Sequence, residues 1–189
     1  TLRGARPGKT VALRADIDAL PIQDQKTCEY ASQTPGVMHA CGHDGHMAQL
    51  LAVARYYSLR REETAGTRVF LFQPAEETLP GGAAAMIREG ALDGVAAVFG
   101  CHLWTPMPYG MVATRPGPLM ASPDEFEIEI AGRGGHAGMP HLSSDALLAG
   151  AHLVTSLQTI VSRNVDPLET AVVTVGRFSA GTANNVIAE

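Results

Sequence analysis

The sequence predicts an α/β protein in which a parallel sheet with covering helices is followed by a smaller α+β unit. In the first half, short apolar runs alternate with patterns of helical period, which is typical of a parallel sheet. In the second half, segments of alternating apolar and charged residues flank one amphipathic helix. Because Pro116-Gly117-Pro118 separates the two patterns, we expect one domain at residues 1–117 and another at residues 118–189.

Three strands and two helices are expected in the first half. Apolar runs at residues 9–15, 67–72 and 95–102 predict the strands. Between the first two, Asp44 can cap a helix that runs to about Arg60. Its apolar positions are Met47, Leu50, Leu51, Ala54 and Tyr57. A shorter helix is expected at residues 82–89, where Gly90 stops it.

The second half predicts a strand, a helix and a second strand. Between residues 124 and 130, apolar residues alternate with glutamates, as in a strand with one face in water. After a glycine-rich turn at residues 132–138, Ser143 or Ser144 is expected to cap the helix. The apolar stripe of this helix consists of Leu147, Ala151, Val154, Leu157 and Val161. Residues 171–178 alternate again and predict the second strand.

Composition and charge narrow the classes of function. The chain has 189 residues, of which 46% are hydrophobic, so it can bury a core. A net charge of −5, with no run of Lys or Arg, argues against nucleic acid as a partner. The longest apolar stretches are about half the length of a membrane helix, and the first residues do not resemble a signal peptide. Three cysteines at unrelated spacings argue against a disulfide framework. We therefore expect a soluble, cytoplasmic protein without a membrane partner.

The segment from His39 to His46 concentrates candidate metal ligands. Its eight residues contain three imidazoles, a thiol and a carboxylate. Imidazole and thiolate suit zinc and other first-row ions, and carboxylates extend the choice to manganese. In an extended segment Cys41 and His43 would point to the same side and could chelate one ion or two neighbouring ions. A free buried cysteine and a helix-capping histidine are the alternative. His39 is a weaker candidate, and His46 is expected to support the site or to pack in the core.

Two other segments carry groups that can join this cluster. Glu76 and Glu77 follow the second expected strand, and His102 ends the third. Ligands of parallel sheets gather beyond the carboxyl ends of the strands. These residues should therefore meet Asp16 and Asp18, which follow the first strand. Because neighbouring glutamates are not expected to face the same point, one could bind metal while the other acts as a base toward a water.

Each of these groups also has a purely structural interpretation. The two glutamates could form an exposed acidic turn, and a lone His102 could be a hydrogen-bonded histidine of the core. Cys101 is expected to pack in the core.

Five motifs in order give the chain a resemblance to a known family. Together they resemble the amidohydrolase branch of the aminoacylase-type metallopeptidases, which contains hippurate hydrolases, plant auxin-conjugate hydrolases and N-acetyldiaminopimelate deacetylases. The resemblance covers nearly the whole chain. The motifs are Arg14-Ala-Asp-Ile-Asp-Ala-Leu-Pro21, His39-Ala-Cys-Gly-His-Asp-Gly-His46, Gln73-Pro-Ala-Glu-Glu77, Gly134-Gly-His-Ala-Gly-Met-Pro-His141 and Gly181-Thr-Ala-Asn-Asn-Val-Ile187.

The resemblance implies a centre for two divalent metal ions. Its implied ligands are Cys41, His43, Glu77 and His102. Glu76 is implied as the general base that activates a bridging water. Asp16 matches the family's catalytic aspartate, which orients a ligand, and Asp18 is the second choice for that role. Manganese or zinc is expected, with nickel and cobalt as the other ions associated with this branch.

The resemblance also implies roles for the second half. That part would be a ferredoxin-like lid through which the protein forms a homodimer. His136 would reach the partner's active site and polarise the carbonyl that is attacked, and its flanking glycines fit an exposed, adaptable turn. A structural glycine-rich loop is the alternative for His136. Asn185, and with it Asn184, matches the lid asparagine that contacts substrate.

The expected activity is metal-dependent hydrolysis of the amide bond of a small N-acyl amino acid, such as a hippurate-type or N-acetyl substrate. Family members are about twice as long as this chain, and a ligand histidine near their C-terminus has no counterpart here. Ala188 stands where the family usually has proline. We therefore expect a fragment that is inactive alone. Two other functions stay open, namely an incomplete binding or dimerisation module and a hydrolase with Cys41 as nucleophile and His43 as its base.

Overall fold

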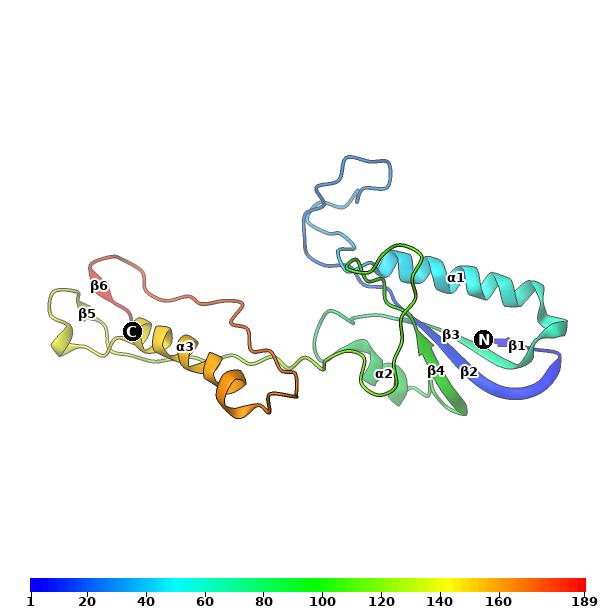
Figure 1. Cartoon of the computed structure of the whole chain (residues 1–189). Coiled ribbons are helices and arrows are strands. Elements are labelled where there is room, and N and C mark those ends of the chain that lie inside the picture. The colour runs from blue at the N-terminus through cyan, green and yellow to red at the C-terminus, as the bar shows by residue number, and fades with distance from the viewer. The chain divides into compact units, whose positions relative to one another are not determined.

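The computed structural model describes residues 1–189, and the chain forms two compact units, Thr1–Ala113 and Thr114–Glu189 (Figure 1). None of the helices is both long enough and apolar enough to cross a membrane.

A four-stranded sheet organises the first unit. Its strands are β1 (Leu2–Arg3), β2 (Arg6–Asp16), β3 (Ala65–Gln73) and β4 (Val95–Gly100), and their order is β1-β3-β2-β4. The central strand β2 pairs in parallel with both β3 and β4, whereas the short β1 pairs antiparallel with β3. The predicted α/β class and the three predicted strands are confirmed, with strand ends that shift by at most three residues.

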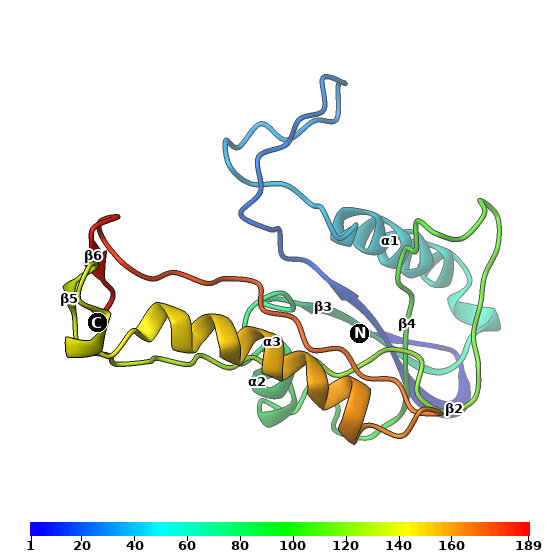
Figure 2. The ribbon, with the colours of Figure 1, turned by 60° about the vertical axis from the view of Figure 1, so that its left-hand side comes forward.

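Two helices connect the parallel strands. Helix α1 (His43–Leu59) lies between β2 and β3 in the chain, and α2 (Gly82–Arg88) lies between β3 and β4. The first connection leads to one side of β2 and the second to the other side. Right-handed crossovers then place the helices on opposite faces, and the ribbon shows α1 and α2 on opposite sides of the strands (Figure 2). Because β2, β3 and β4 are parallel, their carboxyl ends lie at one edge of the sheet.

The most deeply buried side chains of this unit are polar. Ala12, Ala15 and Leu50 form an apolar core of small size, whereas His43 and Asp16 are the largest side chains that are almost completely buried. Buried polar groups are costly unless they have partners, so their contacts decide how this edge is built. Helix α1 turns His43, His46 and Leu50 inward, while Leu51, predicted in the apolar stripe, is exposed.

The N-terminal caps of the two long helices differ from the prediction. Helix α1 begins at His43 after Gly42, which adopts a left-handed backbone with φ of 85°, and Asp44 lies in its first turn without capping it. The helix of the second unit, α3 (Ala146–Asn164), is capped by Asp145, whose carboxylate accepts a hydrogen bond from the backbone N–H of Leu148. Ser143 and Ser144 precede this cap, so the prediction for them is wrong. Several acceptors in succession make a cap position ambiguous from sequence alone.

The second unit consists of α3 and a two-stranded ladder. Strands β5 (Gly135–His136) and β6 (Val186–Ile187) pair antiparallel. Short 3₁₀ turns occur at Pro140–Leu142 in this unit and at Arg61–Glu63 in the first. Helix α3 buries Ala146 and Gly150, whereas the predicted stripe residue Leu147 is exposed.

The strands predicted at residues 124–130 and 171–178 are not formed. Both segments run beside α3 (Figure 1) and line one groove of about 840 Å³ with it, but neither hydrogen-bonds to a neighbouring strand. Apolar side chains of these segments remain exposed to solvent, for example 62% of Phe126 and 82% of Val172. An alternating pattern predicts that one face of a segment is apolar. A strand forms only if a neighbouring segment also accepts and donates its backbone hydrogen bonds.

Candidate metal centre

The carboxyl ends of the three parallel strands bring the predicted residues together. Strand β2 ends at Asp16, Glu76 and Glu77 follow β3, and His102 follows β4. The start of α1 brings Cys41 and His43 to the same place. Ligand atoms lie within 4.8 Å of one another in three overlapping groups, which are Cys41 with His43 and His102, Asp16 with His43 and His46, and His43 with Glu76 and Glu77.

His43 is the residue on which the carboxylates converge. Its Nδ1 atom lies 2.9 Å from the backbone oxygen of Asp18, which can only accept a hydrogen bond. Nδ1 therefore carries a proton, and in the neutral ring Nε2 presents a lone pair. That Nε2 atom is buried without a hydrogen-bond partner. It faces one carboxylate oxygen each of Asp16, Glu77 and Glu76, at 3.7, 3.7 and 3.8 Å.

His102 has the same arrangement. Its Nδ1 lies 2.6 Å from the backbone oxygen of Leu103 and so carries the proton. Its Nε2 lies 3.5 Å from the sulfur of Cys41. Metal-binding histidines usually donate one ring N–H to a carbonyl or carboxylate, which leaves the other nitrogen for the metal. His43 and His102 both meet this criterion.

Cys41 joins the site through a turn rather than through an extended segment. The left-handed Gly42 separates it from His43, so the predicted extended geometry is wrong although both side chains reach the site. Burial and the neighbouring Glu77 carboxylate raise the pKa of the Cys41 thiol to about 11. Cys101, expected in the core, is exposed, as are the last five residues of β4, which precede it.

Glu76 and Glu77 approach the same nitrogen, contrary to the sequence prediction. Alternation of side chains holds only in an extended strand. Here β3 ends at Gln73, Ala75 adopts a positive φ of 51°, and residues 76–78 form a bend. Glu77 is the more buried of the two, with 24% of its side chain exposed against 39% for Glu76. Its Oε1 atom is buried without a partner.

Asp16 and Asp18 occupy different positions around this cluster. Asp16 is buried and forms a 2.7 Å ion pair with Arg14. Burial would raise the pKa of Asp16, but the hydrogen bond from His46 and the charge of Arg14 lower it below its usual value. Asp18 accepts a 2.9 Å hydrogen bond from the backbone N–H of Glu77 and lies 3.3 Å from Nδ1 of His43. Burial would raise the pKa of Asp18, but hydrogen bonds from the backbone of Glu77 and Glu76 lower it.

His46 differs from the two candidate ligands. The backbone N–H of Leu103 donates a 2.8 Å hydrogen bond to its Nε2, and its Nδ1 lies 2.6 Å from Oδ1 of Asp16. Both ring nitrogens are therefore used within the protein. The Nδ1 atom of His39 is buried without a partner, but His39 belongs to none of the three groups.

The donor set fits divalent metal ions. Nε2 of His43 and Oε1 of Glu77 are buried, have no hydrogen-bond partner and lie 3.7 Å apart, and more carboxylates and a thiol surround them. Negative and lone-pair atoms converge in this way where a cation is bound. Carboxylate, imidazole and thiol together suit first-row ions such as manganese and zinc.

Sequence reasoning missed two supporting residues. Arg14 pairs with Asp16, and its Nε donates a 2.9 Å hydrogen bond to the side-chain oxygen of Gln73 at the end of β3. The contact between Arg14 and Asp16 could have been predicted from their spacing, since residues i and i+2 of a strand share a face. The cross-strand contact with Gln73 depends on register and has no local signal.

In the second unit, His136 is exposed in β5, and its Nδ1 accepts a 3.0 Å hydrogen bond from the backbone N–H of Gly138. A neutral ring then carries its proton on Nε2, which can donate. The predicted glycine-rich turn is thus in part a strand. Asn185 accepts a hydrogen bond from the backbone N–H of Ala137 through its own backbone oxygen.

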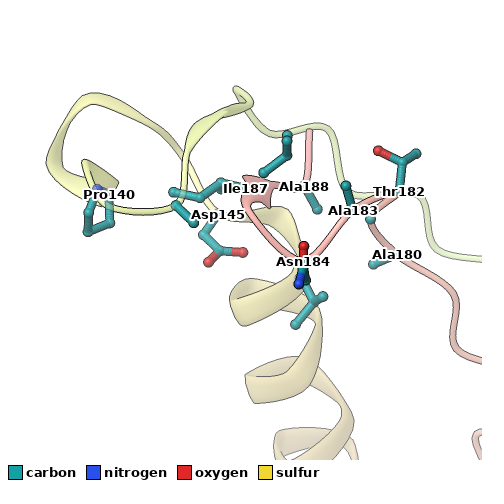
Figure 3. A pocket seen from close by; sticks show the side chains of 12 residues that line it. Pro140, Asp145, Ala180, Thr182, Ala183, Asn184, Ile187 and Ala188 are labelled. Carbon is teal, nitrogen blue, oxygen red and sulfur yellow. The ribbon is translucent and has the colours of Figure 1, made fainter.

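A cavity of about 550 Å³ lies beside β6 and the start of α3. Asn184 lines it together with Asp145 and several small side chains (Figure 3). Asn185 is not among its lining residues. Of the two asparagines, Asn184 is therefore the one that faces this cavity.

Comparison with known proteins finds close relatives. An N-acyl-L-amino acid amidohydrolase of Geobacillus stearothermophilus is 55% identical over 98% of this chain and 50% of its own length. An N-acetylcysteine deacetylase of Bacillus subtilis is 48% identical over 98% of this chain and 49% of its own length. The chain thus spans about half the length of the curated relatives it matches.

Solved structures agree with these relatives. A protein of methicillin-resistant Staphylococcus aureus, assigned as an aminohydrolase, superposes with a TM-score of 0.79 at 43% identity, over 100% of this chain and 50% of its own. The YXEP protein of Bacillus subtilis, described as a dinuclear metal-binding peptidase, gives a TM-score of 0.68 at 36% identity, over 100% of this chain and 47% of its own. The model of peptidase family M20/M25/M40 matches residues 12–186, and the chain belongs to this family.

Proposed function

We propose that this protein hydrolyses the amide bond of small N-acyl amino acids at a centre for two divalent metal ions. One observation carries the proposal. His43 and His102 each use Nδ1 as a donor to a backbone carbonyl, and their Nε2 atoms face carboxylates and a thiol. The names of the amidohydrolase and deacetylase relatives support N-acyl amino acids as the substrate class.

The ligands that we propose are Cys41, His43, Glu77 and His102. Glu77 is the better ligand of the two glutamates because it is more buried and has an unpartnered oxygen. Glu76 is more exposed and so can meet a water and a substrate. The mixture of hard and soft donors favours manganese or zinc, with nickel or cobalt as alternatives.

The bound ions would polarise the substrate carbonyl and lower the pKa of the attacking water. Glu76 accepts the proton of that water while the new C–O bond forms. It then returns the proton to the nitrogen as the C–N bond breaks, so that an acid and a free amino acid leave. One carboxylate can perform both transfers because it is restored after each cycle.

Asp18 and Asp16 would support this chemistry by different contacts. Asp18 lies against Nδ1 of His43 and binds the backbone of Glu77, so we propose that it orients two ligands. Asp16, the first choice from the sequence, contacts Arg14 and His46 instead. We propose that it keeps negative charge beside Nε2 of His43, 3.7 Å away.

We further propose that residues 118–189 act as a lid and dimerisation domain. His136 would donate from Nε2 to the oxygen on which negative charge develops, and its hydrogen bond from Gly138 favours that tautomer. Asn185 is proposed to contact the substrate. The preceding residue, Asn184, lines the cavity beside β6.

The site does not favour a cysteine nucleophile. Catalytic cysteines have a lowered pKa because the thiolate is the nucleophile, whereas burial and Glu77 raise the pKa of Cys41 to about 11. Binding of a metal ion would instead displace the proton of this thiol to solvent and leave the thiolate as the ligand.

Metal removal tests the proposed function. The full-length protein should cleave N-acetyl and N-benzoyl amino acids, lose this activity after dialysis against a chelator, and regain it with manganese or zinc. Blocking accessible thiols after chelation should prevent recovery because Cys41 becomes modified. Activity that survives chelation would instead support the cysteine mechanism. If the metal-loaded protein hydrolysed none of these amides, the alternative of a binding module without catalytic activity would be supported.

A further inference from the structure

We propose that His46 is a positioning residue that holds the end of β4 in place and so directs His102 into the metal centre. This inference rests on the proposed function, since it assigns His102 as a ligand, but it concerns a residue that binds neither metal nor substrate. The structure supplies the chain of contacts that carries it.

The first contact fixes the tautomer of His46. A backbone N–H can only donate, so the 2.8 Å hydrogen bond from Leu103 requires a lone pair on Nε2 of His46. The ring proton is then on Nδ1, where it is donated over 2.6 Å to the buried Asp16 carboxylate. Hydrogen bonds to a charged acceptor are stronger than neutral ones. His46 is therefore fixed by the end of β2 and in turn fixes the segment after β4.

The second contact transmits this position to His102. Leu103 donates its N–H to His46, and its carbonyl oxygen accepts the 2.6 Å hydrogen bond from Nδ1 of His102. One peptide segment thus connects His46 to the orientation of the His102 ring. The two rings also contact each other edge to face, with centroids 4.7 Å apart.

A third contact holds the same segment by packing. The side chain of Leu103 lies over the first turn of α1, where an added Cβ on Gly45 would come within 2.5 Å of its terminal methyl. Glycine at position 45 leaves room for Leu103. The loop after β4 therefore rests on α1 through a hydrogen bond and an apolar contact, both beside His46.

Two amide substitutions separate the two halves of this role. His46→Gln can place an amide oxygen near the position of Nε2 and accept the hydrogen bond from Leu103. His46→Asn is shorter, so it reaches Asp16 but not Leu103. Both variants are neutral, polar and incapable of imidazole chemistry, which makes them a matched pair. His152→Gln, at an exposed position of α3, is the control for loss of a histidine elsewhere.

Cobalt(II) is the probe, because its absorption reports the thiolate bond and the geometry around the ion separately. Relative to the full-length wild type and His152→Gln, His46→Asn should bind cobalt about 10- to 100-fold more weakly, the usual effect of removing a supporting partner of a ligand. Its thiolate-to-cobalt band should remain, because Cys41 is untouched, while the ligand-field bands change. His46→Gln should recover most of the affinity. Equal affinity and equal spectra in all four proteins would overturn the proposal.

A measurement on the metal-free protein keeps this test separate from the metal assignment. Nitrogen-15 spectra of the wild type should show His46 as the Nδ1–H tautomer, and the amide of Leu103 should exchange slowly. In His46→Asn that exchange should accelerate by at least about tenfold, as expected when a hydrogen bond of about 1.4 kcal/mol is lost. An Nε2–H tautomer in the wild type would refute the positioning role even if His46→Asn failed to fold. A wild type that bound no cobalt but showed the slow amide would refute the metal centre alone.

Discussion

At the scale of single residues, the group that faces Nε2 of a histidine separates candidate ligands from their supports. His43 and His102 donate from Nδ1 to backbone carbonyls, whereas Nε2 of His46 accepts from a backbone N–H. Three neighbouring histidines with the same tautomer thus differ in role, because among them only His46 has a backbone donor at Nε2. Residue type and spacing alone do not contain this information.

Glu76→Gln tests the proposed general base. The amide keeps the size of the side chain but cannot take a proton, so kcat in the full-length enzyme should fall by at least about 10²-fold. Metal content should stay unchanged, because Glu77 and not Glu76 is the proposed ligand. Steady-state kinetics and elemental analysis of one preparation check both statements. If metal were lost with the activity, the roles of Glu76 and Glu77 would have to be exchanged.

Cys41→Ser tests the thiolate ligand. Serine keeps a small side chain but is a poor ligand for soft ions, so bound zinc should decrease and preference should move toward manganese. Competition between the two ions, followed by elemental analysis, measures this shift. The exposed Cys101 offers a matched control, since Cys101→Ser should change neither content nor preference. Identical metal content in both variants would return Cys41 to a structural role.

At the scale of elements, parallel strand pairing explains how distant residues meet. Asp16, Gln73 and Gly100 end three adjacent strands, so residues that follow them reach one edge although up to 86 positions separate Asp16 from His102 in the chain. The α/β class, the three strands and the meeting of these residues could all be predicted from apolar periodicity. The bend that turns Glu76 and Glu77 toward one nitrogen could not, because it depends on the backbone of Ala75.

The second unit shows the limit of periodicity more clearly. The alternating segments at residues 124–130 and 171–178 have strand-like sequences but no strand partner. Pairing is a property of two segments, and a pattern in one of them describes only its own faces. The cap of α3 was similarly ambiguous, because Ser143, Ser144 and Asp145 are all good acceptors and only one has its side chain at the helix N-terminus.

Asp145→Ala tests that cap. Removing the acceptor of the Leu148 N–H should destabilise α3 and lower the free energy of unfolding by about 1 kcal/mol. Denaturant unfolding of the full-length protein, observed with a probe in the second unit, measures the change. Ser144→Ala is the control and should have less than half of this effect. A larger loss in Ser144→Ala would move the cap back to the serine.

At the scale of the whole molecule, the proposed dimer makes a prediction about mixed subunits. His136→Ala and Glu76→Ala should each be inactive, but each retains what the other has lost. If His136 acts in the partner's site, free exchange of equal amounts makes about half of the dimers mixed, each with one intact site. About a quarter of wild-type activity should then return. No recovery, with exchange confirmed by native mass spectrometry, would confine His136 to its own chain or to structure.

The central claim is that Cys41, His43, Glu77 and His102 hold two neighbouring metal ions, and X-ray absorption at the zinc K-edge tests it most directly. In the zinc-loaded full-length protein the spectrum should require a sulfur neighbour at about 2.3 Å and nitrogen or oxygen neighbours at about 2.0–2.2 Å. It should also require a second zinc at about 3.5–4 Å, and the sulfur contribution should vanish in Cys41→Ser. A first shell of nitrogen and oxygen alone in the wild type, with no metal neighbour, would contradict the account.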